Sequence, residues 1–147
     1  MRYPLRRSPF LLSALCSLLS LTGCREQGNF KGAEIVCQRY EGKAMRPIGP
    51  GSPYLKAAEE WRKILDRRSR ELERAAGKCP SVENTPPGSL AYEYHTAWDD
   101  TAVGNVVLYY FAPIRDPKVY AGYGIHAVVG VRENRLKKVC VFPVPLE

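Results

Sequence analysis

The chain has 147 residues, and its 22 lysines and arginines against 15 aspartates and glutamates give a formal net charge of +7. This excess is mild, whereas a nucleic-acid-binding protein would present a dense basic stripe. The balance therefore excludes nucleic acid as the expected partner. The length predicts a single domain that can bury its own apolar core.

The first 24 residues contain the parts of an export signal. Arg2, Arg6 and Arg7 precede an apolar run from Phe10 to Leu21. This run is too short to span a bilayer, which needs roughly 20 apolar residues. A secretory signal peptide typically has a positively charged N-terminal region, a short apolar segment and small residues at the end of that segment.

The signal ends in Leu21-Thr22-Gly23-Cys24, which resembles a lipobox, so the chain resembles the bacterial lipoprotein class. The resemblance implies removal of residues 1–23, diacylglyceryl transfer to the Cys24 sulfur, and acylation of the new amino group with a fatty acid such as palmitate. Without the three arginines of the signal, 19 basic and 15 acidic residues remain. This smaller excess suits attraction to anionic lipid headgroups.

Residues 24–32 predict a lipidated N-terminus followed by a flexible tether, because they are polar, contain two glycines and lack an apolar period. Residues 33–147 then form the single domain. Arg25 stands where many Gram-negative lipoproteins have an aspartate that retains them at the inner membrane. The resemblance therefore implies a lipid-anchored protein of the bacterial cell envelope, at the outer membrane and facing the periplasm.

The first part of the domain predicts one strand, one loop and one helix. Ala33–Tyr40 reads as a short strand, and residues 45–53 hold three prolines and two glycines, which predict a loop. From Pro53 to Gly77, apolar residues recur at spacings of three and four, which predicts one long amphipathic helix. Arg68 interrupts its apolar stripe.

The second part of the chain switches to an alternating pattern typical of strands. Asp99, Asp100 and Thr101 are expected to form the first turn of this region. The four expected strands are Leu90–Trp98, Val106–Ala112, Ala121–Val131 and Leu136–Phe142. The order of elements predicts an α+β fold with one long amphipathic helix packed on an antiparallel meander sheet of about four to five strands.

Five cysteines are present, and an exported chain favours disulfide formation. Cys16 leaves with the signal peptide and Cys24 carries lipid, so three thiols remain for one bond. We expect Cys79 to pair with Cys140, because an up-and-down meander returns the end of the last strand to the end of the helix. The direction of the first strand is not fixed, so Cys37–Cys79 stays a serious alternative.

One face of the third expected strand, Ala121–Val131, carries few side-chain atoms. Gly122, Gly124 and Gly130 alternate onto it together with His126. Such a surface allows close approach of a partner, and these four residues are our candidate partner surface. The alternative is a structural role, in which the glycines relieve the twist of the strand or aromatic neighbours such as Tyr110 cover them.

No motif points to chemistry. Gly122, Gly124 and Ala127 match a dinucleotide fingerprint formally, but no helix follows them. Glu93, His95 and His126 are too loosely spaced to predict a metal site. We therefore expect no catalytic residue, no metal and no cofactor.

The sequence thus favours an envelope-anchored lipoprotein with a small, non-catalytic binding or scaffolding domain and an envelope protein as its partner. A first alternative is an inhibitor of a periplasmic or exogenous hydrolase, with the exposed loop Pro113–Tyr120 as the plug. A second alternative is an uncharacterised hydrolase, for which a pocket beside Asp99 or His95 would be the signature.

Overall fold

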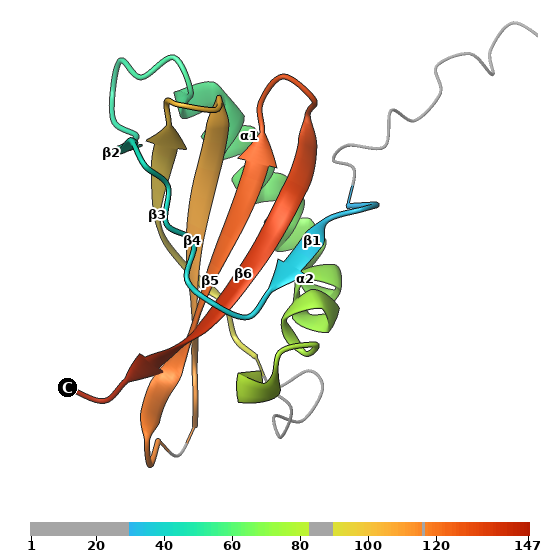
Figure 1. The fold of residues 1–147 in the computed structure, drawn as a ribbon, viewed down its shortest axis with the longest axis vertical. Coiled ribbons are helices and arrows are strands. Elements are labelled where there is room, and N and C mark those ends of the chain that lie inside the picture. Colours follow the sequence, from blue (N-terminus) through green and yellow to red (C-terminus); the bar gives the residue numbers. More distant parts are fainter. Residues whose placement is uncertain (1–29, 83–89, 116) are drawn as a thin grey trace, which may run out of the picture.

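The computed structural model describes residues 30–82, 90–115 and 117–147 (Figure 1). The predicted signal peptide of residues 1–23 and the predicted lipidation site Cys24 lie outside these residues. Within the described ranges, no helix has both the length and the apolar character needed to cross a membrane.

A six-stranded sheet forms the centre of the molecule, in the order β1-β6-β5-β4-β3-β2. The last four strands are consecutive antiparallel neighbours, β2 is antiparallel to β3, and β1 is parallel to β6. The strands are β1 (Glu34–Val36), β2 (Met45–Pro47), β3 (Glu93–Asp100), β4 (Asn105–Pro113), β5 (Tyr120–Gly130) and β6 (Arg135–Pro145).

The prediction of an antiparallel meander sheet of about four to five strands is therefore wrong, because the sheet is mixed and has six strands. The strand at residues 34–36 runs parallel to β6 along one edge, with Val36 opposite Cys140. The next strand, β2, lies at the opposite edge of the sheet and takes up the start of residues 45–53, which we expected to form a loop. The chain connects the two edges by crossing the sheet on the face opposite the helices (Figure 1). We call this connection, residues 37–44, the strap.

The prediction of one long helix is also wrong, because the helical region divides at Arg68. Helix α1 spans Leu55–Arg67, and α2 spans Ser69–Ala76. Arg68 has φ −107° and ψ 28°, outside the helical region. Its guanidinium is held by Glu71 at 2.6 Å and lies 4.1 Å from the Phe30 ring centre. On either side of the break, α1 contacts β4 and α2 contacts β6.

The main core lies between these helices and the sheet. Trp61 and Leu65 of α1 and Leu72 of α2 are almost completely buried against it. The Trp61 indole Nε1–H donates to Asn134 Oδ1 at 3.0 Å, which fixes α1 to the β5–β6 turn. A short 3-10 helix, Pro80–Val82, follows α2.

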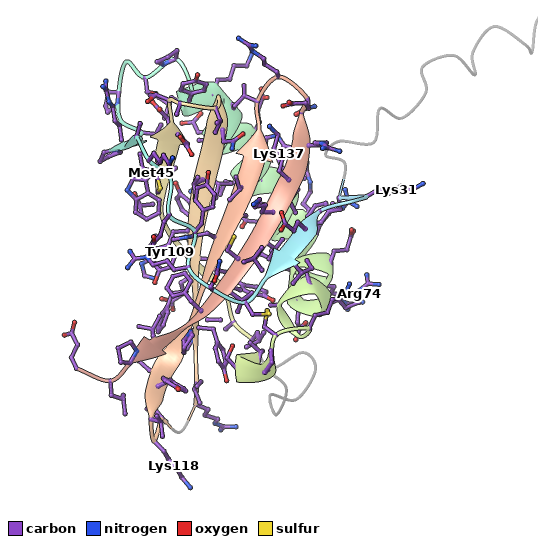
Figure 2. All side chains as sticks on the ribbon, viewed as in Figure 1. Lys31, Met45, Arg74, Tyr109, Lys118 and Lys137 are labelled. Carbon is purple, nitrogen blue, oxygen red and sulfur yellow. A yellow bond between two sulfur atoms is a disulfide. The ribbon has the colours of Figure 1, made fainter. Side chains whose placement is uncertain are left out.

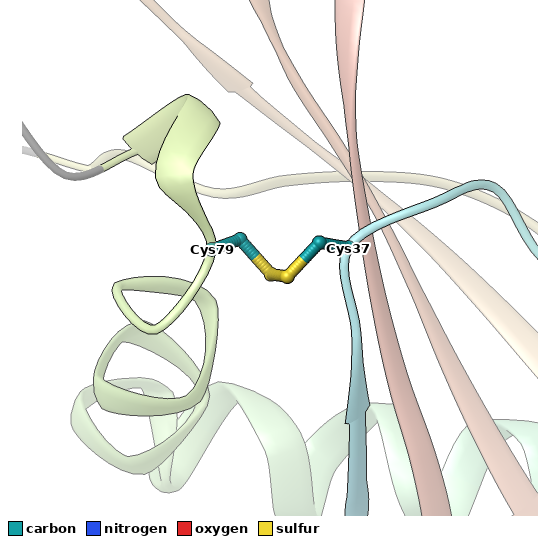
Figure 3. Close-up of a disulfide and its surroundings, with 2 residues drawn as sticks. All are labelled: Cys37 and Cys79. Atoms are coloured by element: carbon teal, nitrogen blue, oxygen red, sulfur yellow. A yellow bond between two sulfur atoms is a disulfide. The ribbon is translucent and has the colours of Figure 1, made fainter.

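The prediction of a disulfide is confirmed, but the predicted pairing of Cys79 with Cys140 is wrong. Cys37, at the start of the strap, bonds Cys79, just after α2 (Figure 3). The reason is a bulge in β6, where Val129 pairs with Leu136 but Val128 pairs with Lys138. The extra residue places Cys140 on the strap face, where it is buried as a free thiol.

Candidate functional site

The sheet face beneath the strap carries a continuous group of aromatic rings. We call this group the aromatic patch, and Figure 2 shows its central residue, Tyr109, on the face that the strap crosses. The Tyr109 ring lies 5.5 Å from each of the two histidine rings and stacks at 14° on Phe142. The patch consists of His95, Trp98, Tyr109, Phe111, His126 and Phe142.

The alternation of the strands assembles this patch. Successive side chains of a strand point to opposite faces, so Tyr109 and Phe111 of β4 lie on the strap face while Tyr110 enters the main core. The β3–β4 register shifts between Tyr94 and Thr96. This bulge brings His95 beside both Tyr109 and Phe111, at 5.5 and 5.9 Å between ring centres.

Two glycines of the predicted partner surface, Gly122 and Gly124, lie beneath these rings. Gly122, Gly124 and Gly130 are all buried. A methyl group at Gly124 would collide with the ring of Phe142, and one at Gly122 with the ring of Phe111 and a main-chain carbonyl. Gly122 and Gly124 therefore let the rings of Phe111 and Phe142 lie flat on the sheet, whereas a methyl group at Gly130 would meet the side chains of Lys137 and Glu133. At Gly122 and Gly124 the rings, and not the glycines, are what the face presents to a partner.

The structure buries His126 at the centre of the patch. His126 is 2% exposed and its ring lies 5.0 Å from Phe142 and 5.7 Å from Trp98. Burial lowers its pKa to about 4, and the positive charge of Arg39 contributes in the same direction. His126 is thus neutral at pH 7, and its Nδ1 has no hydrogen-bond partner among the described residues.

A pocket of about 600 Å³ opens over the patch. The strap contributes Arg39, whose guanidinium lies 5.6 Å from the Phe142 ring centre. None of the ion pairs among the described residues involves Arg39. The rest of the lining comes from the aromatic patch, from Thr96 of β3 and from the end of β6, namely His95, Thr96, Trp98, Tyr109, His126, Phe142, Pro143, Val144 and Pro145.

A buried polar contact holds the strap in place. The Tyr40 hydroxyl donates to Asp100 Oδ2 at 2.6 Å. Burial and the neighbouring Asp100 raise the pKa of Tyr40 to about 12. Asp99 and Asp100 are buried residues at the end of β3, whereas we expected them in a turn. The contact fixes the strap, and with it Arg39, above the patch.

The other candidate sets do not assemble into a recognisable site. Gly122, Gly124 and Ala127 lie inside β5 and precede no helix. In the part of the chain that the structure describes, no three His, Cys, Asp or Glu side chains gather closely enough to hold a metal ion. Asp99 is not among the residues that line the pocket beside His95.

Sequence reasoning missed Arg39 and the rings around His126. The alternation of β4 already placed Tyr109 and Phe111 on the face opposite Tyr110, so this signal was present. Nothing in the sequence indicated that Arg39 would cross the sheet.

Searches for related proteins leave the chain without a match, whether among protein-family models, curated proteins or solved structures.

Proposed function

We propose that this chain is a lipid-anchored envelope protein whose domain binds another envelope protein through the aromatic patch and performs no chemistry of its own. The observation that carries the proposal is the patch itself. Large aromatic side chains gathered on one open face are typical of binding surfaces, where they contribute much of the binding energy.

The patch is suited to binding because three of its rings are both partly accessible and fixed in place. Trp98, Tyr109 and Phe142 are half-buried, so each keeps contact area for a partner. Their neighbours on the sheet restrict them, so little side-chain entropy remains to be lost on binding. A surface organised in this way favours recognition of a partner.

The anchor limits where that partner can lie. The lipobox supports lipidation at Cys24, and β1 begins only ten residues later, at Glu34. An extended chain of that length reaches at most about 35 Å. The domain therefore stays close to the membrane surface, and we infer that its partner is a protein of the same envelope.

The hydrolase-inhibitor alternative rests on one separate observation. The hairpin between β4 and β5 projects from the sheet, with Lys118 near its tip (Figure 2). Val119 beside it is 66% exposed. A plug for a hydrolase would use this hairpin, whereas the proposed function uses the aromatic patch.

Crosslinked co-purification from native envelopes distinguishes these two functions. His95 is exposed on the patch, so His95→Glu should place a carboxylate there without unfolding the domain. We expect His95→Glu to abolish recovery of the crosslinked partner, and the matched charge change Lys118→Glu to leave it unchanged. Loss with Lys118→Glu and recovery with His95→Glu would reject the patch and favour the hairpin.

A further inference from the structure

The pocket over the aromatic patch combines apolar walls with one positive charge. Of the described lining residues, Arg39 is the only one with a lysine, arginine or carboxylate side chain. The pocket floor is formed by the rings of Tyr109, His126 and Phe142. The lining therefore favours a ligand with an aromatic group and a negative charge.

The charge of Arg39 remains available for such a ligand. Its guanidinium has the Phe142 ring as a neighbour but no carboxylate partner in an ion pair of the described chain. A guanidinium can stack on a ring and still donate hydrogen bonds in its own plane. Arg39 can thus hold a carboxylate while the ring attached to that carboxylate packs against Tyr109.

The edge of the sheet beside the pocket favours a polypeptide over a free small molecule. Strand β1 pairs with β6 only from Lys138 to Cys140. On that side, residues 141–145 of β6 have no strand partner among the described elements, and Phe142–Pro145 also line the pocket. Main-chain carbonyls at such an edge can accept hydrogen bonds from an incoming chain.

We propose that the pocket binds the C-terminal residue of a partner polypeptide when that residue is aromatic, with its ring on the patch and its terminal carboxylate on the Arg39 guanidinium. This inference rests on the proposed function, because it names the chemistry by which the patch recognises its protein partner.

The test uses the full chain in a non-ionic detergent and matched peptides. Trp61→Phe leaves Trp98, which lines the pocket, as the single tryptophan and thus as the fluorescent reporter. The probes are acetylated Gly-Ser-Gly-Phe as a free acid, the same peptide as a C-terminal amide, and the free acid ending in alanine. We expect the aromatic acid to bind at least about tenfold more tightly than either other peptide.

Two arginine variants test whether Arg39 supplies the positive charge that makes the free acid bind more tightly than the amide. Arg39→Gln should lower the affinity of the aromatic acid to that of the amide, whereas the exposed control Arg46→Gln on β2 should change neither affinity. Equal binding of acid and amide overturns the role of the carboxylate. Equal binding of the phenylalanine and alanine acids overturns the role of the ring, and 3-phenylpropionate binding as tightly as the peptide overturns the polypeptide source.

Failure of this inference is separable from failure of the proposed function. If no peptide binds but His95→Glu still abolishes partner recovery, the assigned ligand chemistry is wrong and the patch remains the binding surface. If His95→Glu leaves partner recovery unchanged, the proposed function itself is wrong.

Discussion

Removing the Cys37–Cys79 bond should destabilise the domain strongly. The two cysteines are 42 positions apart in sequence. In the chain-entropy treatment, closing a loop of this length stabilises the folded state by about 4 kcal/mol. This is a large part of the roughly 5–15 kcal/mol that a typical domain has in total. The proposed perturbation is Cys37→Ser together with Cys79→Ala, because Cys37 is exposed and Cys79 is buried.

Urea unfolding followed by tryptophan fluorescence measures this effect, with and without reductant. With a denaturant slope of about 2 kcal/mol per molar, the midpoint should fall by about 2 M. Reductant should lower the midpoint of the wild-type chain similarly but leave the double variant unchanged. The control Cys140→Ala removes the free thiol and should stay sensitive to reductant. Loss of that sensitivity in Cys140→Ala would refute the pairing and the bulge argument behind it.

Three further predictions concern the strap face. Between pH 6.5 and about 4, an unfolded histidine binds more protons than folded His126, so the stability of the folded domain should fall as the pH drops through this window. Urea midpoints measured against pH would show this fall as a slope, and His126→Phe should flatten that slope. Tyr40→Phe should lower the free energy of unfolding by about 1.5–3 kcal/mol, because it removes the hydrogen bond to the buried carboxylate of Asp100. This decrease should be smaller in an Asp100→Asn background. Gly122→Ala should lower the melting temperature more than Gly124→Ala. An added methyl group at Gly122 meets a main-chain carbonyl, whereas at Gly124 it meets only side-chain atoms of Phe142, which can shift at a lower cost than the main chain. The reverse order would contradict this interpretation.

The strands in the second half of the chain could be predicted because the sequence signal for a strand is local. Alternation alone places strands around Val106–Ala112 and Ala121–Val131, and the structure has β4 and β5 there. The helical periodicity was equally clear, but it did not show that Arg68 leaves the helical conformation. That break depends on contacts with Phe30 and Glu71 and on the path of the sheet beneath.

The disulfide pairing and the candidate site depended on long-range features. A single extra residue in β6 moved Cys140 to the strap face, and such a bulge has no clear signature in the sequence. The glycine face of β5 was visible in the alternation, but the rings that cover it come from neighbouring strands. The position of Arg39 required knowing that β1 and β2 lie at opposite edges of the sheet.

Site-specific photocrosslinking in living cells tests the central claim most directly, namely that the aromatic patch is the binding surface. A photoreactive phenylalanine derivative at position 95 would lie on the patch, and one at position 59 would lie on an exposed part of α1. We predict one discrete protein adduct from position 95 and none from position 59. An adduct from position 59 with none from position 95 would contradict the account.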